Sequence, residues 1–262
     1  MNTFTPEQTR LLLFFSALII LFCVETLWPC RRWEDRRLSR VIVHGFLSIL
    51  NAVTMRLLVA APLAAWISFV QSQQWGLLHS LGWLGPGGVL LTLLVLDLFD
   101  YWWHRWNHEV ALLWRFHRVH HTDTHLDVTT ALRFHIGELL LSALVKAVWI
   151  LIWGPSLWGF ALFEAMITTA ALFHHSNLDL PPRWENVIWK LLVTPRFHTS
   201  HHTVTPRTRE ANYSTVIILW DKIFGTFRYP DPVEMKALGL PQDRENHLKL
   251  GTILVSPLQK LK

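Results

Sequence analysis

The chain has 262 residues, of which 51% are hydrophobic and only 16% are charged. A soluble domain usually carries about 25% charged residues, so the composition argues against an ordinary soluble enzyme and against a disordered chain. The formal net charge of +5 comes from arginines beside apolar runs rather than from a basic patch on a soluble fold, which argues against a nucleic-acid partner.

Apolar runs predict the membrane spans, because a bilayer core needs about 20 apolar residues to cross it as a helix. No small-residue cleavage site follows the first run, so we interpret it as a retained span and not as a signal peptide. The second run is too long for one upright span, and we expect Pro62 to kink it or to separate a span from an interfacial piece. The last two runs, joined by Gly154-Pro155-Ser156, form a predicted helical hairpin. The predicted spans are residues 11–28, 41–70, 87–103, 137–153 and 157–173.

An arginine-rich loop after the first span predicts the orientation of the chain, because such loops stay cytoplasmic. It contains Arg31, Arg32, Arg36, Arg37 and Arg40. Two further crossings return the chain to that side at residues 104–135, and the hairpin returns it again at residues 174–202. Both histidine-rich segments are therefore expected at the cytoplasmic face. No linker divides the chain, so we expect a single membrane domain over residues 1–262.

The histidines of these two segments are spaced like metal ligands. His104 and His108 are four residues apart and share one face of a helix. Two later groups repeat a spacing of three and four together with their flanking residues, Arg115-Phe116-His117-x-x-His120-His121-Thr122 and Arg196-Phe197-His198-x-x-His201-His202-Thr203. Eight histidines exceed the four ligands of one structural zinc ion, so the pattern predicts two metal ions with open positions. An all-nitrogen set suits iron, zinc, copper or nickel, and the residues alone do not choose among them.

Carboxylates lie on the same helical stripe as the first histidine pair. Asp100 is one turn before His104 and is a candidate hydrogen-bond partner for it, because metal-bound histidines usually donate their other N–H to a carboxylate or carbonyl. Glu109 is a candidate ligand or base. The isolated His44, His79 and His247 are interpreted as satisfied interfacial residues, His125 as a loop residue, and Lys146 and Glu164 as a pair across the hairpin.

Two other kinds of protein use histidines on membrane helices. A zinc enzyme or a metal transporter is one, although a transporter would place its histidines at mid-bilayer and these lie beyond the span ends. A bis-histidine haem electron carrier is the other, although it needs only two axial histidines for each haem. Both remain alternatives at this point.

The order HxxxH, HxxHH, helical hairpin and second HxxHH resembles the fatty acid hydroxylase / sterol desaturase superfamily of integral-membrane di-iron oxygenases. The resemblance covers about residues 104–227 and includes four further segments, TTALRFH at 129–135, HHSNL at 174–178, TPR at 194–196 and WDKIFGTF at 220–227. His108-Glu109 looks like the arrangement of the alkylglycerol monooxygenase-like branch, and bacterial sterol desaturase members are similar in pattern.

The resemblance implies an all-α fold, a polytopic transmembrane helical bundle with a cytoplasmic helical cap that carries a histidine-rich dimetal site. One of His174 and His175 is implied as a ligand, and His135 is a candidate because family members often have a histidine before Pro and Glu. Ile136 replaces that Pro here, whereas Glu138 is retained. The full set of implied and candidate ligands is His104, His108, His117, His120, His121, His135, His174, His175, His198, His201 and His202.

The implied activity is O2-dependent hydroxylation or desaturation of a membrane lipid, such as a sterol or fatty acyl lipid, with two iron ions as cofactor. Asp100 and Glu109 would orient ligands or move protons. Electrons would come from a separate donor (a reductase, ferredoxin or cytochrome b5-like protein), because the chain has no flavin or dinucleotide fingerprint. The small size leans toward a bacterial inner membrane, with the endoplasmic reticulum as the alternative. The sequence does not identify the lipid.

Overall fold

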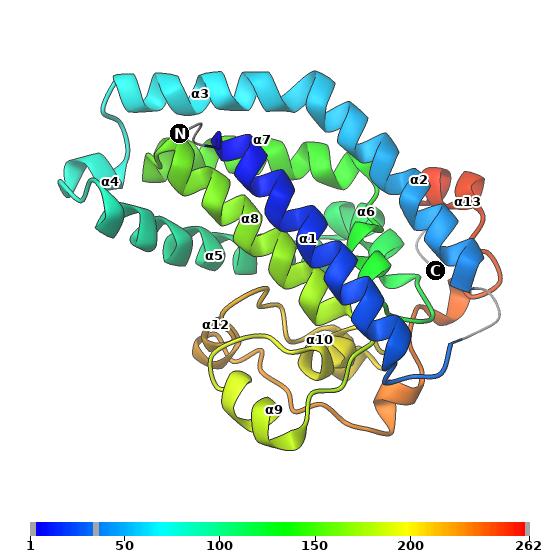
Figure 1. Ribbon diagram of the computed structural model, residues 1–262. Helices are drawn as coiled ribbons and strands as arrows, with labels where there is room; N and C mark the ends of the chain where they lie inside the picture. The colour runs from blue at the N-terminus through cyan, green and yellow to red at the C-terminus, as the bar shows by residue number, and fades with distance from the viewer. Residues whose placement is uncertain (1–3, 34–36, 260–262) are drawn as a thin grey trace.

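The computed structural model describes residues 4–33 and 37–259, and in this part of the chain the fold is all-helical, as predicted (Figure 1). The longer helices are α1 (Pro6–Leu27), α2 (Arg37–Met55), α3 (Ala61–Ser72), α5 (Pro86–Glu109), α6 (Ala111–His121), α7 (Ile136–Trp153) and α8 (Leu157–His175). The shorter ones are η1 (Arg56–Ala60), α4 (Leu77–Ser80), η2 (Val128–Leu132), α9 (Pro182–Ile188), α10 (Pro195–His201), α11 (Pro206–Arg209), α12 (Leu219–Ile223), η3 (Glu234–Lys236), η4 (Pro241–Asp243), α13 (Leu250–Val255) and η5 (Ser256–Leu258).

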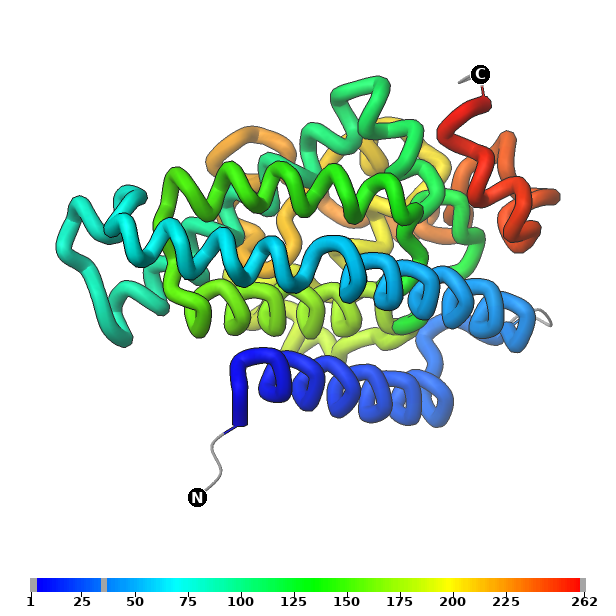
Figure 2. The backbone as a smooth tube through the Cα atoms, turned by 90° about the horizontal axis from the view of Figure 1, so that it is seen from above, coloured from blue at the N-terminus to red at the C-terminus, as the bar shows by residue number. Residues whose placement is uncertain are grey.

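Helix α1 begins at a capping box and lies on the outside of the bundle. The Thr5 hydroxyl accepts from the Gln8 N–H, the Gln8 side chain accepts from the Thr5 N–H, and Pro6 occupies the first turn, where its missing N–H costs nothing. Figure 2 shows α1 lying along α8, against which it packs. Only Glu25 of α1 is buried, and the side of α1 away from α8 exposes large apolar side chains such as Leu12, Phe15 and Ile19, as expected of a helix in lipid.

The long second apolar run folds as one bent rod. One turn of π-helix, η1, precedes Pro62 and separates α2 from α3, which meet at an angle in Figure 1. Proline has no N–H to donate and crowds the carbonyl four residues earlier, and a wider turn relieves both problems. The rod packs along α7. Pro62 therefore bends the chain without ending the helix, which continues as α3 to Ser72.

The helical hairpin expected around Gly154 is present. Gly154 ends α7 in the left-handed region at φ +73°, and the Ser156 hydroxyl caps α8 by accepting from the Gly159 N–H at 2.9 Å. The predicted ion pair across the hairpin is confirmed, because Lys146 Nζ lies 2.6 Å from Glu164 Oε1. Such a pair neutralises two charges that would otherwise face apolar surroundings.

Among the described residues, four helical regions are long and apolar enough to cross a membrane: Pro6–Leu27, Arg37–Ser80, Ile136–Trp153 and Leu157–His175. The predicted span 87–103 is also helical, but it belongs to α5, which is not one of the four. Helix α5 carries Asp97, Asp100 and further charges as well as the first histidine pair, which lowers its apolar character. The cytoplasmic position of the histidine segments therefore stays a prediction.

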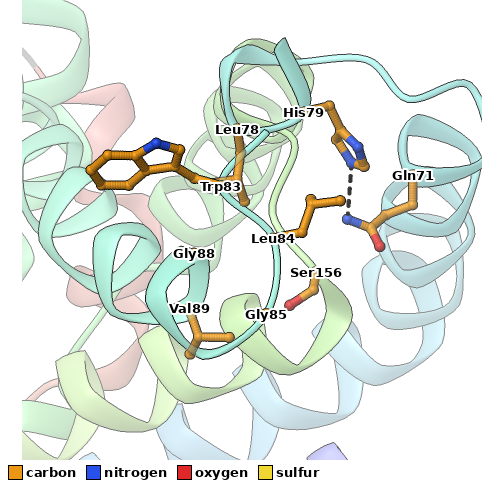
Figure 3. Close-up of a pocket in the computed structure, with 9 residues that line it drawn as sticks. All are labelled: Gln71, Leu78, His79, Trp83, Leu84, Gly85, Gly88, Val89 and Ser156. Atoms are coloured by element: carbon orange, nitrogen blue, oxygen red, sulfur yellow. Dashed lines mark hydrogen bonds between the residues drawn. The ribbon is translucent and has the colours of Figure 1, made fainter. Parts of the chain in front are cut away.

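One end of the bundle is closed by a tight contact between the turn before α4 and the α7–α8 turn. A Cβ on Gly76 would lie 2.5 Å from the Gly154 nitrogen, so only glycine fits there. Beside this contact is a pocket of about 260 Å3, where the His79 ring approaches the Gln71 amide at 3.4 Å (Figure 3). Its lining residues are Gln71, Leu78, His79, Trp83, Leu84, Gly85, Gly88, Val89 and Ser156. The histidines of α5 and α8 lie at the other ends of these two helices, in their last turns.

Candidate metal centre

The first histidine pair lies on the last turns of α5. The His104 Nδ1 atom is 2.7 Å from the carbonyl oxygen of Tyr213, and because a carbonyl only accepts, the ring must donate. The His108 Nδ1 atom is 3.1 Å from the Glu210 carboxylate. Each ring is therefore held by a hydrogen bond at Nδ1, and its Nε2 atom faces inward.

Helix α6 supplies the next three histidines from its last two turns. His117 Nδ1 lies 2.8 Å from Glu138 Oε1 on the first turn of α7. His120 Nδ1 lies 3.3 Å from the Arg133 carbonyl oxygen, and the Phe134 ring stacks on the His120 ring at 4.6 Å. The segment that follows α6 thus folds back and fixes two of its three imidazoles.

The second HxxHH motif lies on α10, a helix of only two turns. Thr194 caps it by accepting from the Phe197 N–H at 3.3 Å, and Pro195 fits the first turn. His201 Nδ1 donates to the Ala211 carbonyl oxygen at 2.6 Å. This short helix lies against the end of α8 and presents its histidines to those of α5 and α6.

Nine histidines from α5, α6, α8 and the α10 motif lie in two adjoining groups. In each group one ring nitrogen from every member lies within 4.8 Å of those of the others. The five-histidine group comprises His104, His108, His117, His121 and His201. The four-histidine group comprises His120, His175, His198 and His202. The groups touch directly, since the rings of His121 and His202 stack at 4.3 Å.

Each HxxHH motif contributes to both groups. His117 and His121, four residues apart on one helical face, belong to the five-histidine group, whereas His120 belongs to the other group. The second motif has the reverse assignment: positions four apart, His198 and His202, join the four-histidine group, and His201 crosses to the five-histidine group. The repeated spacing therefore divides each motif between the two neighbouring groups.

Bare nitrogen lone pairs face each other inside both groups. His120 and His175 each donate from Nδ1 to a backbone carbonyl, so their Nε2 atoms, 2.9 Å apart, both carry lone pairs and cannot hydrogen-bond to each other. His104 and His201 repeat the arrangement, with Nε2 atoms 3.1 Å apart. Two nitrogens bound at right angles to one metal ion lie about 3.0 Å apart when each bond is about 2.1 Å. These separations fit a shared cation.

Further ring nitrogens in the groups are buried and have no hydrogen-bond partner within residues 4–33 and 37–259. They are His108 Nε2, His117 Nε2, His121 Nδ1 and Nε2, His198 Nδ1 and His202 Nδ1. Burial removes water from these rings and, together with neighbouring imidazoles, lowers the pKa of His121, His198 and His202 well below the usual value. Neutral imidazoles are the form that binds metal, and a buried donor set of this kind fits a pair of transition-metal ions.

Two of the predicted ligand histidines lie outside both groups. His174 donates from Nδ1 to the Thr215 carbonyl oxygen and packs against the His198 ring at 3.9 Å, so of the adjacent pair only His175 contributes a group nitrogen. His135 caps α7: its Nδ1 accepts from the Gly137 N–H at 2.9 Å, and its Nε2 donates to the Leu254 carbonyl oxygen at 3.1 Å. Both nitrogens of His135 are therefore already engaged.

The predicted catalytic carboxylates also lie away from the groups. Asp100 accepts from the Thr215 hydroxyl at 2.7 Å, and the bond from His104 that we expected it to receive goes to the Tyr213 carbonyl instead. Glu109 pairs with Arg105 at 2.8 Å on the exposed side of α5. In α5 the turn before His104 faces the loop around Thr215, and the residue after His108 points out of the bundle.

Sequence reasoning did not identify the carboxylates that do hold ligands. Glu138 was noted only as a retained family residue, and Glu210 was missed altogether. Asp221 was also missed; it accepts from the backbone N–H groups of Tyr213 and Ser214 at 2.8 and 2.9 Å and so fixes the carbonyl that His104 uses. Two of the three gave a signal in the sequence, Glu138 as a retained family residue and Asp221 within the WDKIFGTF segment.

Two of the arginines predicted in the loop after the first span lie in α2 instead. Arg37 begins that helix, and Arg40, one turn later, is fully buried and bonds Asp123 at 2.8 Å and Asp127 at 2.6 Å, directly after the first HxxHH motif. Burial alone would raise the pKa of the Asp123 carboxyl, but the Arg40 guanidinium outweighs this and holds that pKa well below its usual range. Arg36 lies outside the described residues. Arg40 is thus a structural part of the site's surroundings.

Two of the histidines that were interpreted as satisfied, His44 and His247, have hydrogen-bond partners in this same region. His44 Nδ1 pairs with the Thr129 hydroxyl at 2.8 Å, and its Nε2 accepts from Arg133 at 3.2 Å. His247 Nδ1 donates to the Arg244 carbonyl oxygen. His125 lies between α6 and η2, as the loop prediction had it, and packs against Trp33.

Comparison with known proteins identifies relatives of this site. Residues 89–226, which include all nine grouped histidines, match the protein family described as fatty acid hydroxylase. The chain is 27% identical to alkylglycerol monooxygenase of Homo sapiens over 219 residues, which cover 82% of this chain and 46% of that protein. The corresponding protein of Danio rerio is 33% identical over 139 residues, which cover 52% of this chain and 30% of the relative.

A bacterial relative is similar over a comparable stretch. Ornithine lipid hydroxylase OlsE of Rhizobium tropici is 28% identical over 182 residues, which cover 70% of this chain and 52% of that protein. The chain thus spans about a third to a half of the length of these relatives. No solved structure matches the chain.

Proposed function

The chain belongs to the fatty acid hydroxylase family, and we propose that it is an O2-dependent di-iron oxidoreductase that hydroxylates or desaturates a C–H bond of a membrane lipid. The observation that carries the proposal is the pairing of bare Nε2 lone pairs, His120 with His175 and His104 with His201, which a cation bound in each group would satisfy. Two relatives named as a monooxygenase and a lipid hydroxylase support the oxygenase chemistry.

When bound, two iron ions supply the redox chemistry that activates O2 for hydrogen abstraction from an unactivated C–H bond. The protein holds the imidazoles in one tautomer through the backbone carbonyls of Tyr213, Arg133 and Ala211. Burial of the groups excludes bulk water, which would otherwise intercept reactive species. Hydroxylation consumes one O2, two electrons and two protons, and it yields an alcohol and one water.

The electrons must come from a separate donor protein such as a reductase, a ferredoxin or a cytochrome b5-like protein. We propose a lipid as the substrate, because one relative is named as a lipid hydroxylase and because the apolar outward surfaces of α1, α2 and α3 suit a bilayer, where lipids are available. We propose that the histidine groups face the cytoplasm, in a bacterial inner membrane or alternatively the endoplasmic reticulum. The proposal includes no nucleic-acid partner.

The alternatives explain less of the geometry. A bis-histidine haem uses two axial imidazoles, and it would leave the other clustered nitrogens of nine histidines without a partner. A zinc enzyme would fill the groups but would use no O2, and the similarity to a monooxygenase and a lipid hydroxylase favours redox chemistry.

The test uses membranes from cells with and without the gene, supplied with a reductant and 18O2. The expected result is a lipid that gains one 18O atom only when the protein is present, or a lipid that loses two hydrogens if the reaction is desaturation. Identical lipid profiles in the two membranes, with iron-loaded protein present, would overturn the proposal. The profile also identifies the lipid.

A further inference from the structure

The two histidine groups differ in the hydrogen-bond partners of their Nδ1 atoms. In the five-histidine group, two imidazoles face carboxylates: His117 faces Glu138 at 2.8 Å and His108 faces Glu210 at 3.1 Å. In the four-histidine group, His120 and His175 face only backbone carbonyls. The remaining rings of the four-histidine group, His198 and His202, have no Nδ1 partner among the described residues.

A carboxylate behind a ligand acts differently from a carbonyl. Both accept the Nδ1–H and fix the ring, but the carboxylate also adds a negative charge close to the metal position and makes the opposite nitrogen more basic. Net charge and hydrogen bonding around a site are among the factors that set the reduction potential of bound iron. The two positions therefore have the same kind of ligand and unequal electrostatic surroundings.

We infer that Glu138 and Glu210 make the two metal positions unequal, so that the five-histidine group binds its cation more tightly, and holds iron at a lower reduction potential, than the four-histidine group. The inference rests on the proposed two-metal function and assigns Glu138 and Glu210 as positioning residues. Neither carboxylate reaches the ring nitrogens that face the metal positions.

Glu138 is expected to have the larger influence of the two. Its side chain is 5% exposed, and its Oε2 has no hydrogen-bond partner among the described residues, so its negative charge needs a nearby cation. Glu210 is 39% exposed, and its other oxygen accepts from Arg209 at 2.8 Å. Water and Arg209 both weaken the field of Glu210 at the metal position.

The experiment removes the negative charge of each carboxylate and keeps an oxygen that can accept the hydrogen bond. Glu138→Gln and Glu210→Gln each retain an oxygen that can accept from the histidine, so an effect in these variants reports charge rather than ring orientation. Glu234→Gln is the matched control, because Glu234 accepts from the Thr208 hydroxyl at 2.9 Å and belongs to neither histidine group. Full-length protein, freed of metal by a chelator, is titrated with Co2+ and followed by visible absorbance.

Two Co2+ ions should bind to the unsubstituted protein in two phases. Glu138→Gln should weaken the tighter phase by about 10–100-fold, because mutation of the group that accepts from a metal-binding histidine typically costs that much metal affinity, and Glu210→Gln should weaken it less. Both variants should leave the weaker phase unchanged. The Glu234→Gln control should bind Co2+ as the unsubstituted protein does. In the iron-loaded protein, a redox titration should show a raised potential for only one of the two irons.

Several outcomes would overturn the inference. One is unchanged binding in both Gln variants, and another is equal weakening of both phases. If Glu138→Gln fails to fold, the surface variant Glu210→Gln decides alone. Fewer than two Co2+ ions bound to the unsubstituted protein would instead overturn the proposed function, which separates the two failures.

Discussion

The two HxxHH motifs share their flanking residues and spacing, but they differ in the interactions that support them. The first motif is followed by a buried ionic network, in which Arg40 bonds Asp123 and Asp127. The second is supported mainly by hydrogen bonds: Thr194 caps the helix and donates to the Glu185 carboxylate at 2.7 Å, and Asn212 donates to the Ser200 hydroxyl at 2.9 Å. Each short helix thus presents imidazoles to both histidine groups, one beside buried ion pairs and the other beside hydrogen bonds.

The difference predicts unequal sensitivity to substitution. Buried charges are costly to desolvate, so a network of them is strongly destabilised when one partner is removed. Substitution of a helix cap removes only the hydrogen bonds that the cap makes. The first motif should therefore depend on distant residues such as Arg40, whereas the second should depend on residues close to it in the sequence.

The largest expected effect comes from removing a ligand. His120→Ala should abolish activity and lower the metal content to about one ion per chain, because one position loses a ligand in a preassembled site. His174→Ala is the matched control: it removes a buried imidazole beside the site but no group nitrogen. Metal analysis and activity of the two purified variants compare them, and full metal content in His120→Ala would contradict the assignment of His120.

The next effect tests the charged support of the first motif. Arg40→Met should destabilise the protein by about 3–5 kcal/mol, because it leaves Asp123 and Asp127 buried without their cation. Arg196→Met is the control at the second motif, since the Arg196–Asp179 pair is on the surface and contributes about 0–1 kcal/mol. Chemical denaturation in detergent measures both variants, and equal losses would refute the contrast.

The smallest effect tests the hydrogen-bonded support of the second motif. Thr194→Ala should cost about 1–2 kcal/mol, because the Phe197 N–H loses its cap and the Glu185 carboxylate loses a donor at 2.7 Å. The same denaturation measurement applies, with Thr194→Ser as the variant that keeps the hydroxyl. A loss as large as that of Arg40→Met would show that the two motifs are supported alike.

Much of the fold and most of the ligand set followed from local patterns. Helix periodicity and spacing depend on neighbours in the sequence, so the all-helical fold, the hairpin at Gly154 and the pairing of His117 with His121 were predictable. The division of each HxxHH motif between two groups was not. It depends on how α6 and α10 approach each other in space.

The hydrogen-bond partners were the least predictable part of the site. Glu210 reaches His108 from 102 residues away, and the Tyr213 carbonyl reaches His104 from 109 residues away. Asp100 is close in sequence to His104 and was expected to be its partner, yet tertiary packing turns it toward Thr215. Sequence proximity indicates a candidate partner, but the path of the distant loop decides which group receives the bond.

The most direct test of the two-metal account is the iron content of protein purified in active form, measured together with its Mössbauer spectrum before and after anaerobic reduction. The account predicts two iron ions per chain in two unequal environments, one for each histidine group, with activity proportional to iron content. Active protein with fewer than two irons per chain, or activity supported by zinc alone, would contradict it.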